Sequence, residues 1–459
     1  MQKVYNEVNT LDKRCIKKYN LSEDLLMENA SLNIANFIRK KFKKSKTVLV
    51  ISGFGNNGAD GIVLARLLHS EYNIRLYMPF ALKSSIAKLQ ENRARKCGVK
   101  IVNKISKCDI IVDCLFGTGL NRELSSDSIN IIITLNSMDS YKIACDIPSG
   151  IDIKGNISTI AFKANTTITM GALKKLFFTD KAKDYIGKIK VASLGVSRKL
   201  YETKSKSYLL EKSDLILPNR NKKDTHKGTF GHLSVIIGDK KGAGYISCNS
   251  ALKFGVGLIT AITNNEDLPN SIMTNKILPS NTTAIAIGMG LGDTKYKDEV
   301  LYSSVPTLCD ADMFYDKNIL KLLNKDNIVL TPHPKEFCNL LKLCKIDDIS
   351  IEELQNNRFK YVELFCKKYP KVVLLLKGAN VLIGQKDKIY INTFGTNALS
   401  FGGSGDILSG LISSLLAQGY SSISATISGS LSHTLAAKKY KGNKYSLCPN
   451  DLIKQLKKL

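Results

Sequence analysis

The sequence predicts an α/β protein built from two tandem domains. Short runs rich in Val and Ile alternate with segments of helical periodicity. The runs are nearly continuous in apolar residues, which is typical of strands buried on both faces of a parallel sheet. A polar, Lys-rich stretch around residue 205 interrupts the alternation, which then starts again. We therefore expect domains at residues 1–205 and 206–459.

The elements of the first domain can be placed in order. Helical spacing over residues 22–44 predicts a helix, and the apolar positions that carry this pattern are Leu25, Leu26, Ile34, Phe37 and Ile38. Strands are expected in the runs TVLVIS, IRLYM, KIVNK, DIIVDCLF, KIACDI and NTTITM, with helical patterns between most of them.

The second domain repeats this alternation without an internal sequence repeat. Strands are expected in GHLSVIIG, LITAIT, TAIAIGMGLG, TLCDAD, NIVLTPHP, KVVLLLKGAN and IYINT. Helices are expected through SCNSALKFG, over residues 351–368, and over a long segment from about Asp406.

Composition limits the function classes. The 67 Lys and Arg against 40 Asp and Glu give a net charge of +27, which suggests anionic partners. The lysines are scattered and there is no Trp, so a solubilising surface is favoured over nucleic-acid binding. The eleven cysteines include no CxxC pair, and no run approaches the roughly 18 apolar residues of a membrane span. We expect a cytoplasmic protein with reduced cysteines and without nucleic-acid or membrane partners.

Polar residues gather at three expected strand ends of the first domain, in residues 53–61 (GFGNNGADG), 112–120 (VDCLFGTGL) and 145–152 (CDIPSGID). Ligands of open α/β sheets bind at such ends. The oxygen-bearing side chains there are Asn56, Asn57, Asp60, Asp113, Thr118, Asp146 and Ser149. Hard oxygens suit Mg²⁺, Ca²⁺ or an alkali cation, whereas zinc would require a His or Cys cluster.

The first loop also matches GxGxxG, but a redox dinucleotide fold should carry an acidic residue about 20 positions later. The segment NIRLYMPF has none. Each aspartate taken alone is better explained as a turn or a helix cap. Three such loops in one domain favour a site.

These motifs, with the opening LDKRCIKKYNLSEDLLMENA, resemble the NAD(P)H-hydrate epimerase domain over about residues 1–205. The resemblance implies a Rossmann-like three-layer sandwich that holds hydrated NADH or NADPH (NADHX or NADPHX) beside a potassium ion. It implies three potassium ligands, Asn57, Asp113 and Ser149. It implies substrate contacts from Asn56, Asn57, Gly58, Ala59, Asp60, Gly117, Thr118, Gly119, Leu120, Asn121, Arg122, Glu123 and Asp146.

Within that set, Asp146 is the first choice for the catalytic acid–base residue and Asp60 the second. The chain departs from the family at Ala59, where Gly is usual. An alanine would be strained there if the position required a positive φ.

The second domain contains Gly402, Gly403 and Gly405 directly before an expected helix whose first turn carries Asp406. Backbone N–H groups and the helix dipole would stabilise a transferring phosphoryl group, and Asp406 could take the proton of an attacking hydroxyl. An aspartate in a first turn often serves only the dipole, but the adjacent glycines favour the catalytic interpretation. His333 lies between two prolines, and Lys377 at a strand end could reach phosphate.

The motifs HKGTFG, GMGLG, CDAD, TPHPKEF, LKGA and GGSGD occur in the order of the ADP/ATP-dependent NAD(P)H-hydrate dehydratases, over about residues 206–459. This resemblance implies a ribokinase-like fold, with ADP or ATP as co-substrate and Mg²⁺. It implies contacts to the hydrated nicotinamide from Gly290, His333 and Asp406. It implies contacts to the adenine nucleotide from Lys377, Gly378, Ala379, Asn380, Val381 and Gly405.

Together the resemblances imply a two-step repair enzyme, an isomerase joined to a lyase. One domain would interconvert the two epimers of the hydrate. The other would phosphorylate the ring hydroxyl of one epimer and eliminate phosphate. The layout favours ADP over ATP, and a homo-oligomer is expected. The alternatives are a ribokinase-class small-molecule kinase with an accessory domain and, from the charge, a nucleic-acid or membrane-surface binding protein.

Overall fold

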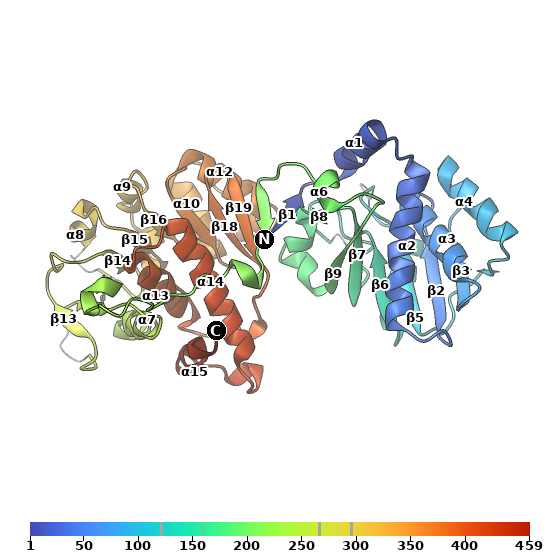
Figure 1. Cartoon of the computed structure of the whole chain (residues 1–459). Helices are drawn as coiled ribbons and strands as arrows, with labels where there is room; N and C mark the ends of the chain where they lie inside the picture. The colour runs from blue at the N-terminus through green and yellow to red at the C-terminus, as the bar shows by residue number, and fades with distance from the viewer. Residues whose placement is uncertain (120–122, 158, 265–267, 294–296) are drawn as a thin grey trace. The chain divides into compact units, whose positions relative to one another are not determined.

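The computed structural model describes residues 1–119, 123–157, 159–264, 268–293 and 297–459. The chain divides into two compact units. The N-terminal unit comprises Lys3–Ser205, and the C-terminal unit comprises Lys206–Leu459 with Met1–Gln2. Both units are α/β, as expected from the sequence (Figure 1).

The N-terminal unit is built on a parallel sheet with the strand order β4-β3-β2-β5-β6-β7-β9. Its strands are β2 (Thr47–Ser52), β3 (Asn73–Tyr77), β4 (Ile101–Val102), β5 (Ile110–Cys114), β6 (Tyr141–Cys145), β7 (Thr166–Met170) and β9 (Lys188–Ala192). A short parallel pair is formed by β1 (Gln2–Tyr5) and β8 (Leu173–Lys174). The helices are α1 (Asn9–Tyr19), α2 (Glu23–Lys41), α3 (Asn56–Leu68), α4 (Ser85–Lys96), α5 (Ser126–Ser137) and α6 (Arg198–Tyr201).

Alternation along β2 explains the three layers of this unit. Val48 and Val50 pack into a core that includes residues of α2 and α3. Leu49 and Ile51 point to the other face and pack with residues of α5. All four side chains are fully buried. Strands buried on both faces read as continuous apolar runs, so β2 appears in the sequence as TVLVIS.

The C-terminal unit has a larger, mixed sheet. Its strands run in the order β13-β12-β11-β14-β15-β16-β17-β18-β19-β10, with antiparallel pairing only at β17–β18–β19 among these described pairs. Their bounds are β10 (Ser207–Leu209), β11 (His232–Ile236), β12 (Leu258–Ile262), β13 (Met273–Asn275), β14 (Ala284–Ile287), β15 (Thr307–Cys309), β16 (Ile328–Leu330), β17 (Val373–Leu376), β18 (Val381–Gln385) and β19 (Lys388–Asn392).

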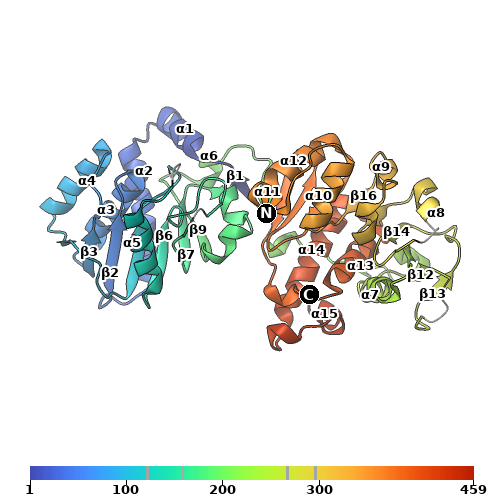
Figure 2. The same cartoon turned by 180° about the vertical axis from the view of Figure 1, so that it is seen from behind.

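Helices cover both faces of this sheet. They are α7 (Lys241–Lys253), α8 (Lys297–Tyr302), α9 (Ile319–Leu322), α10 (Pro334–Leu343), α11 (Ile351–Asn356), α12 (Arg358–Lys368), α13 (Ser404–Ala417), α14 (Ser422–Lys439) and α15 (Pro449–Gln455). Figures 1 and 2 show α13 and α14 on one face and α10 and α12 on the other. The single helix expected over residues 351–368 is in fact two helices that meet at Asn357.

Most of the cysteines are buried thiols. Cys97 and Cys448 are exposed and Cys338 is intermediate, whereas the other eight are buried, and none forms a disulfide. Among the described residues, no helix combines the length and apolar character needed to cross a membrane.

Candidate functional site

The first candidate site lies where β2, β5 and β6 end. These strands are parallel neighbours, so their carboxyl ends meet at one edge of the sheet. Two glycines of the first loop, Gly53 and Gly58, are required by close backbone approaches. A Cβ on Gly53 would lie 1.9 Å from the carbonyl oxygen of Leu115, and one on Gly58 would lie 2.0 Å from that of Gly53. The loop therefore folds tightly enough for α3 to begin at Asn56.

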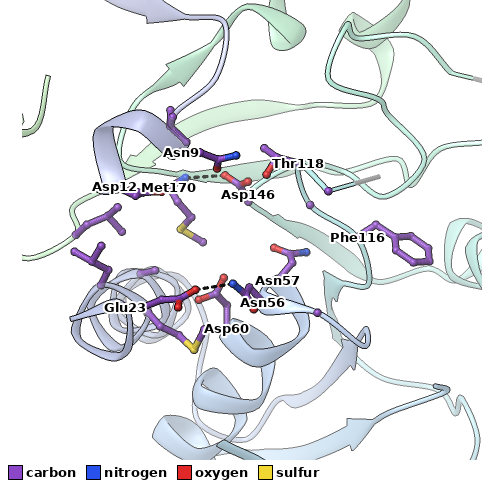
Figure 3. Close-up of a pocket in the computed structure, with 18 of the residues that line it drawn as sticks. Asn9, Asp12, Glu23, Asn56, Asn57, Asp60, Phe116, Thr118, Asp146 and Met170 are labelled. Carbon is purple, nitrogen blue, oxygen red and sulfur yellow. Dashed lines mark hydrogen bonds between the residues drawn. The ribbon is translucent and has the colours of Figure 1, made fainter. Parts of the chain in front are cut away.

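A cavity of about 590 Å³ opens at this edge. Of the residues expected from the sequence, those lining it are Asn56, Asn57, Asp60, Gly117, Thr118, Gly119 and Asp146. Figure 3 shows Asp146 and Thr118 on one side of the cavity and Asp60 and Asn56 on the other. Gly58 and Ala59 are buried within α3 and do not line it, and neither does Glu123. The expected contacts Leu120, Asn121 and Arg122 lie outside the described residues.

Asp146 is held in an unusual backbone conformation. Its φ is +62°, in the left-handed region that few non-glycine residues occupy. Its Oδ1 accepts hydrogen bonds from the Lys174 ammonium at 2.5 Å, the Met170 N–H at 3.0 Å and the Thr169 hydroxyl at 3.1 Å. Lys174 is fully buried. The carboxylate is therefore fixed by one oxygen while the residue lines the cavity (Figure 3).

The three expected potassium ligands include a tightly bonded pair. The buried carboxylate of Asp113 accepts from the Ser149 hydroxyl at 2.7 Å and from the Ser149 N–H at 2.8 Å. Burial raises the pKa of Asp113 to about 6. The amide group of Asn57 is buried, and neither its oxygen nor its nitrogen has a hydrogen-bond partner among the described residues. A buried polar group needs a hydrogen-bond or ion partner, so the Asn57 amide is a candidate group for holding a ligand.

Two further carboxyl groups of the cavity are protonated more readily than usual. Burial raises the pKa of Asp60 well above its ordinary range, and the charges of Asp146, Asp12 and Glu23 raise it further. Burial also raises the pKa of Asp12, which accepts a 2.7 Å hydrogen bond from the Tyr201 hydroxyl. Asp12 and Glu23 both line the cavity.

The departure at Ala59 causes no strain. Ala59 lies in α3 with its N–H bonded to the Gly55 carbonyl at 3.0 Å. It is not among the positive-φ residues, so its backbone suits alanine as well as glycine.

The second candidate site lies in the C-terminal unit, before α13. Gly403, with φ of +92°, precedes the helix, and Asp406 stands in its first turn. Burial raises the pKa of Asp406 to about 6, and the charge of Asp310 raises it further while that of Lys377 lowers it. A Cβ on Gly405 would lie 3.3 Å from the Lys377 ammonium nitrogen. The glycine loop and Lys377 therefore adjoin.

Asp310 holds Lys377 in place. Its carboxylate accepts from the Lys377 ammonium at 2.6 Å and from the Ser409 hydroxyl at 2.6 Å, and it is 2% exposed. Arg358, at the start of α12, holds the segment that follows Lys377. Its guanidinium donates hydrogen bonds to the carbonyl oxygens of Lys377 at 2.9 Å and Asn380 at 3.0 Å.

His333 caps α10. Its Nδ1 accepts from the N–H groups of Lys335 at 3.1 Å and Glu336 at 3.3 Å, so part of its role is structural. Burial lowers the pKa of His333, and Lys377 lowers it further. The imidazole therefore stays neutral beside the lysine. Burial raises the pKa of the adjoining Glu336 to about 7.

The remaining expected contacts occupy particular backbone positions. Gly290 has φ of +65°, and a Cβ there would lie 2.6 Å from the Lys240 carbonyl oxygen. Gly378, Ala379 and Asn380 form the loop between β17 and β18, and Val381 is the first residue of β18.

Sequence reasoning did not select several residues that the structure places at the sites. In the first site these are Asn9, Asp12, Glu23 and Lys174; in the second they are Asp310, Arg358 and Ser409. Asp310 lies in the CDAD motif, which could have revealed it. The others lie on helices or in the short strand β8, where no loop motif marks them.

Two α/β units, each with an acidic group beside a glycine-rich loop at its own sheet edge, define the class of the protein as a two-site enzyme for small polar substrates. Residues 233–458 match the family model described as NAD(P)H-hydrate dehydratase, and residues 23–176 match the YjeF-related protein N-terminus. The chain belongs to the family of bifunctional NAD(P)H-hydrate repair enzymes.

The similarity to relatives of this name extends over whole chains. The chain is 42% identical to the bifunctional NAD(P)H-hydrate repair enzyme Nnr of Helicobacter pylori, with 100% of each chain covered. It is 32% identical to the Nnr of Coxiella burnetii, covering 96% of this chain and 95% of the relative. Among solved structures, an ADP/ATP-dependent NAD(P)H-hydrate dehydratase from Bacillus subtilis aligns at 26% identity with a TM-score of 0.46, covering 53% of this chain and 92% of the other.

Proposed function

We propose that the N-terminal unit interconverts the epimers of NAD(P)H-hydrate and that the C-terminal unit dehydrates one epimer in a nucleotide-dependent reaction. The observation that carries this division is that each unit has its own acid–base group in its own site. Asp146 and Asp60 face a cavity of the first unit, and Asp406 adjoins the glycine loop of the second. Both units fall within the family named above.

Hydration of an enamine places the hydroxyl on the ring carbon next to nitrogen. Epimerisation there can proceed when that hydroxyl leaves as water and water returns to the other face. The ring nitrogen supplies the electron pair that stabilises the intermediate cation. One face therefore needs a proton donor and the other a proton acceptor. The carboxyl of Asp60, whose pKa burial raises well above its ordinary range, and the carboxylate of Asp146 lie on opposite sides of the cavity (Figure 3) and suit these roles.

A potassium ion beside this cavity fits the residues present. The described residues contain no group of three or more His, Cys, Asp or Glu side chains that could hold a metal ion. The proposal therefore rests on a mixed set of hard oxygens, namely the unpartnered amide of Asn57, the carboxylate of Asp113 and the hydroxyl of Ser149. A cation there would supply positive charge for the phosphates of the substrate.

For the C-terminal unit we propose Asp406 as the general base. It would take the proton of the ring hydroxyl as that oxygen attacks the terminal phosphoryl group of ADP or ATP. Lys377 and the N–H groups at the start of α13 would stabilise the charge on the phosphoryl oxygens. Gly290 and His333 would contact the hydrated ring, and residues 377–381 with Gly405 the nucleotide, with Mg²⁺ bound to its phosphates. Loss of phosphate from the carbon that bore the hydroxyl, with loss of a proton from the neighbouring ring carbon, would then restore the double bond.

The test is to add separated epimers of hydrated NADH to the purified chain. With ADP or ATP, both epimers should regain the absorbance of reduced nicotinamide, with release of one free phosphate per NADH. Without nucleotide, the chain should only interconvert the epimers. A stable phosphorylated product without NADH would indicate a small-molecule kinase instead. The expected homo-oligomer stays a prediction, which light scattering in solution checks.

A further inference from the structure

We propose that Asp12 is a third acid–base residue of the epimerase cavity and that the Tyr201 hydroxyl positions it. The inference rests on the proposed epimerase function and deepens it. Asp12 comes from α1 and lines the same cavity as Asp146 and Asp60 (Figure 3).

The carboxylate of Asp146 is already engaged in hydrogen bonds. Its Oδ1 already accepts three hydrogen bonds, one of them from the buried ammonium of Lys174. A proton transferred to this carboxylate would weaken a charge-assisted pair that lies away from water. Asp146 is therefore held in position to orient an incoming water molecule and to pass its proton on.

Asp12 has a different environment. Among the described residues the hydrogen-bond donor recorded to its side chain is the neutral hydroxyl of Tyr201, at 2.7 Å. Asp12 has no ammonium ion within bonding distance in the described ion pairs. A carboxylate with one neutral donor accepts a proton more readily than one paired with lysine. The raised pKa of Asp12 agrees with this difference.

Tyr201 is itself held rigidly. It is 2% exposed, and its ring packs against Gly171, where a Cβ would lie 2.3 Å from the ring carbon that bears the hydroxyl. Gly171 has φ of +73° and follows β7 directly. A buried ring in a fixed slot places its hydroxyl reproducibly, so Asp12 has a fixed position on the cavity wall.

Protons are conserved over one turnover of the proposed reaction. Asp60 donates a proton to the ring hydroxyl, the carbon–oxygen bond breaks, and water leaves. A second water, hydrogen-bonded to Asp146, forms a carbon–oxygen bond on the other face of the ring cation. Asp146 takes the proton of this water and passes it to Asp12. The reverse reaction exchanges the donor and acceptor roles of Asp12 and Asp60, so no other reactant is needed.

The test compares four full-length variants, each assayed without nucleotide so that only epimerisation proceeds. Asp12→Asn should lower the epimerisation kcat by roughly 10²–10⁴, with an unchanged thermal transition. Asp146→Asn should also be impaired. Tyr201→Phe keeps the ring and removes the hydroxyl. Tyr5→Phe is the matched control. Tyr5 is a buried tyrosine of the same unit, and its hydroxyl donates to the Thr203 carbonyl oxygen at 2.9 Å. Tyr5 does not line the cavity.

The pH profile separates positioning from general structural support. The pKa of Asp12 is affected by four neighbouring groups, Tyr201, Lys174, Asp146 and Glu7. The charge of Asp12 in turn raises the pKa of Asp60. The Tyr201 hydrogen bond stabilises the ionised form of Asp12 and so lowers its pKa. In Tyr201→Phe the acidic limb of the kcat/KM profile should therefore move to higher pH, while in Tyr5→Phe it should not move.

Near-normal epimerisation by Asp12→Asn, with Asp146→Asn impaired, would overturn the role of Asp12 and leave the epimerase function intact. If Asp12→Asn fails to fold, an unshifted pH profile in Tyr201→Phe overturns the inference instead. Absence of epimerisation by the unmodified chain would refute the proposed function itself.

Discussion

Asp406 combines a helix-start position with burial that raises its pKa to about 6. As general base it must be ionised, so the nucleotide-dependent kcat should fall as the pH drops through about 6. Asp406→Asn keeps the shape but cannot accept the proton, so turnover should drop by roughly 10²–10⁴. The measurement is NADH regained from the correct epimer with ADP or ATP.

The matched control for Asp406 is Asp451→Asn, which alters an aspartate in the first turn of α15 in the same unit. Turnover and melting temperature should both stay near those of the unmodified chain. If Asp406→Asn turns over normally, Asp406 serves only the helix dipole, which is worth about 0.3–1 kcal/mol.

Replacement of Asp113 should impair the first site. Asp113→Asn removes the negative charge while keeping a group that can bond to Ser149. Epimerisation should become slow and lose its response to potassium, because the proposed cation would lose its one charged ligand. Initial rates are measured across a potassium titration at constant ionic strength.

Dehydration of the correct epimer by Asp113→Asn should stay unchanged, because Asp113 lies in the other unit. An unaltered potassium response would refute the cation site.

The contact between α13 and α14 gives a prediction about pH and stability. His433 on α14 is buried, and its Nε2 lies 3.2 Å from the Ser404 hydroxyl at the start of α13. Burial lowers the pKa of His433 from 6.5 to about 4. Between those values the unfolded chain binds the proton and the folded chain does not, so stability falls as the pH drops from 6.5 towards 4. The loss is on the order of 3 kcal/mol at about 1.4 kcal/mol per pKa unit.

His433→Gln cannot titrate, so the melting temperature of the C-terminal unit should depend less on pH between 7 and 4. His226→Gln, which changes an exposed histidine of the same unit, should keep the dependence of the unmodified chain. Equal slopes in the two variants would contradict a neutral, buried His433.

Elements with continuous apolar runs could be predicted from the sequence, and elements defined by pairing could not. TVLVIS forms β2 because both faces of the strand are buried. The expected helix over 351–368 is interrupted at Asn357. Because of the break, Arg358 is the first residue of a new helix, and its guanidinium donates to the carbonyl oxygen of Lys377. Helical periodicity continues across the break, so the sequence could not reveal it. The strand β18 was missed although it begins with the short apolar run VLI; its pairing with β17 and β19 depends on tertiary contacts.

The same distinction holds for the sites. Asp146, Asp113 and Asp406 lie in or next to glycine-rich loops, which a motif can identify. Asp12 and Tyr201 are 189 positions apart and meet only in the folded unit. Asp310 is buried and accepts a hydrogen bond from the Lys377 ammonium. Their roles follow from packing, which the sequence does not display.

For the whole molecule, the two compact units predict separable activities. A fragment of residues 206–459 lacks Met1, whose amino group pairs with Glu211 and Asp214 at 2.9 Å. Such exposed pairs are worth about 0–1 kcal/mol, so the fragment should fold. It should convert one epimer completely and stall on the other, apart from slow spontaneous exchange. The assay is the final yield of NADH from an epimer mixture.

Adding a fragment of residues 1–205 to that assay should restore complete conversion. Equal consumption of both epimers by residues 206–459 alone would show that the activities are not divided between the units.

The burial of the cysteines has a practical consequence. Each unit has one exposed thiol, Cys97 in the first and Cys448 in the second, and most of the others are shielded in the core. Brief labelling with a maleimide dye pair, with Cys338→Ser to block the one intermediate site, would place one fluorophore on each unit. Energy transfer between them would report whether the distance between the two labels changes during turnover. The shielded thiols would react only when a unit opens, so their slow labelling times unfolding in each half of the chain.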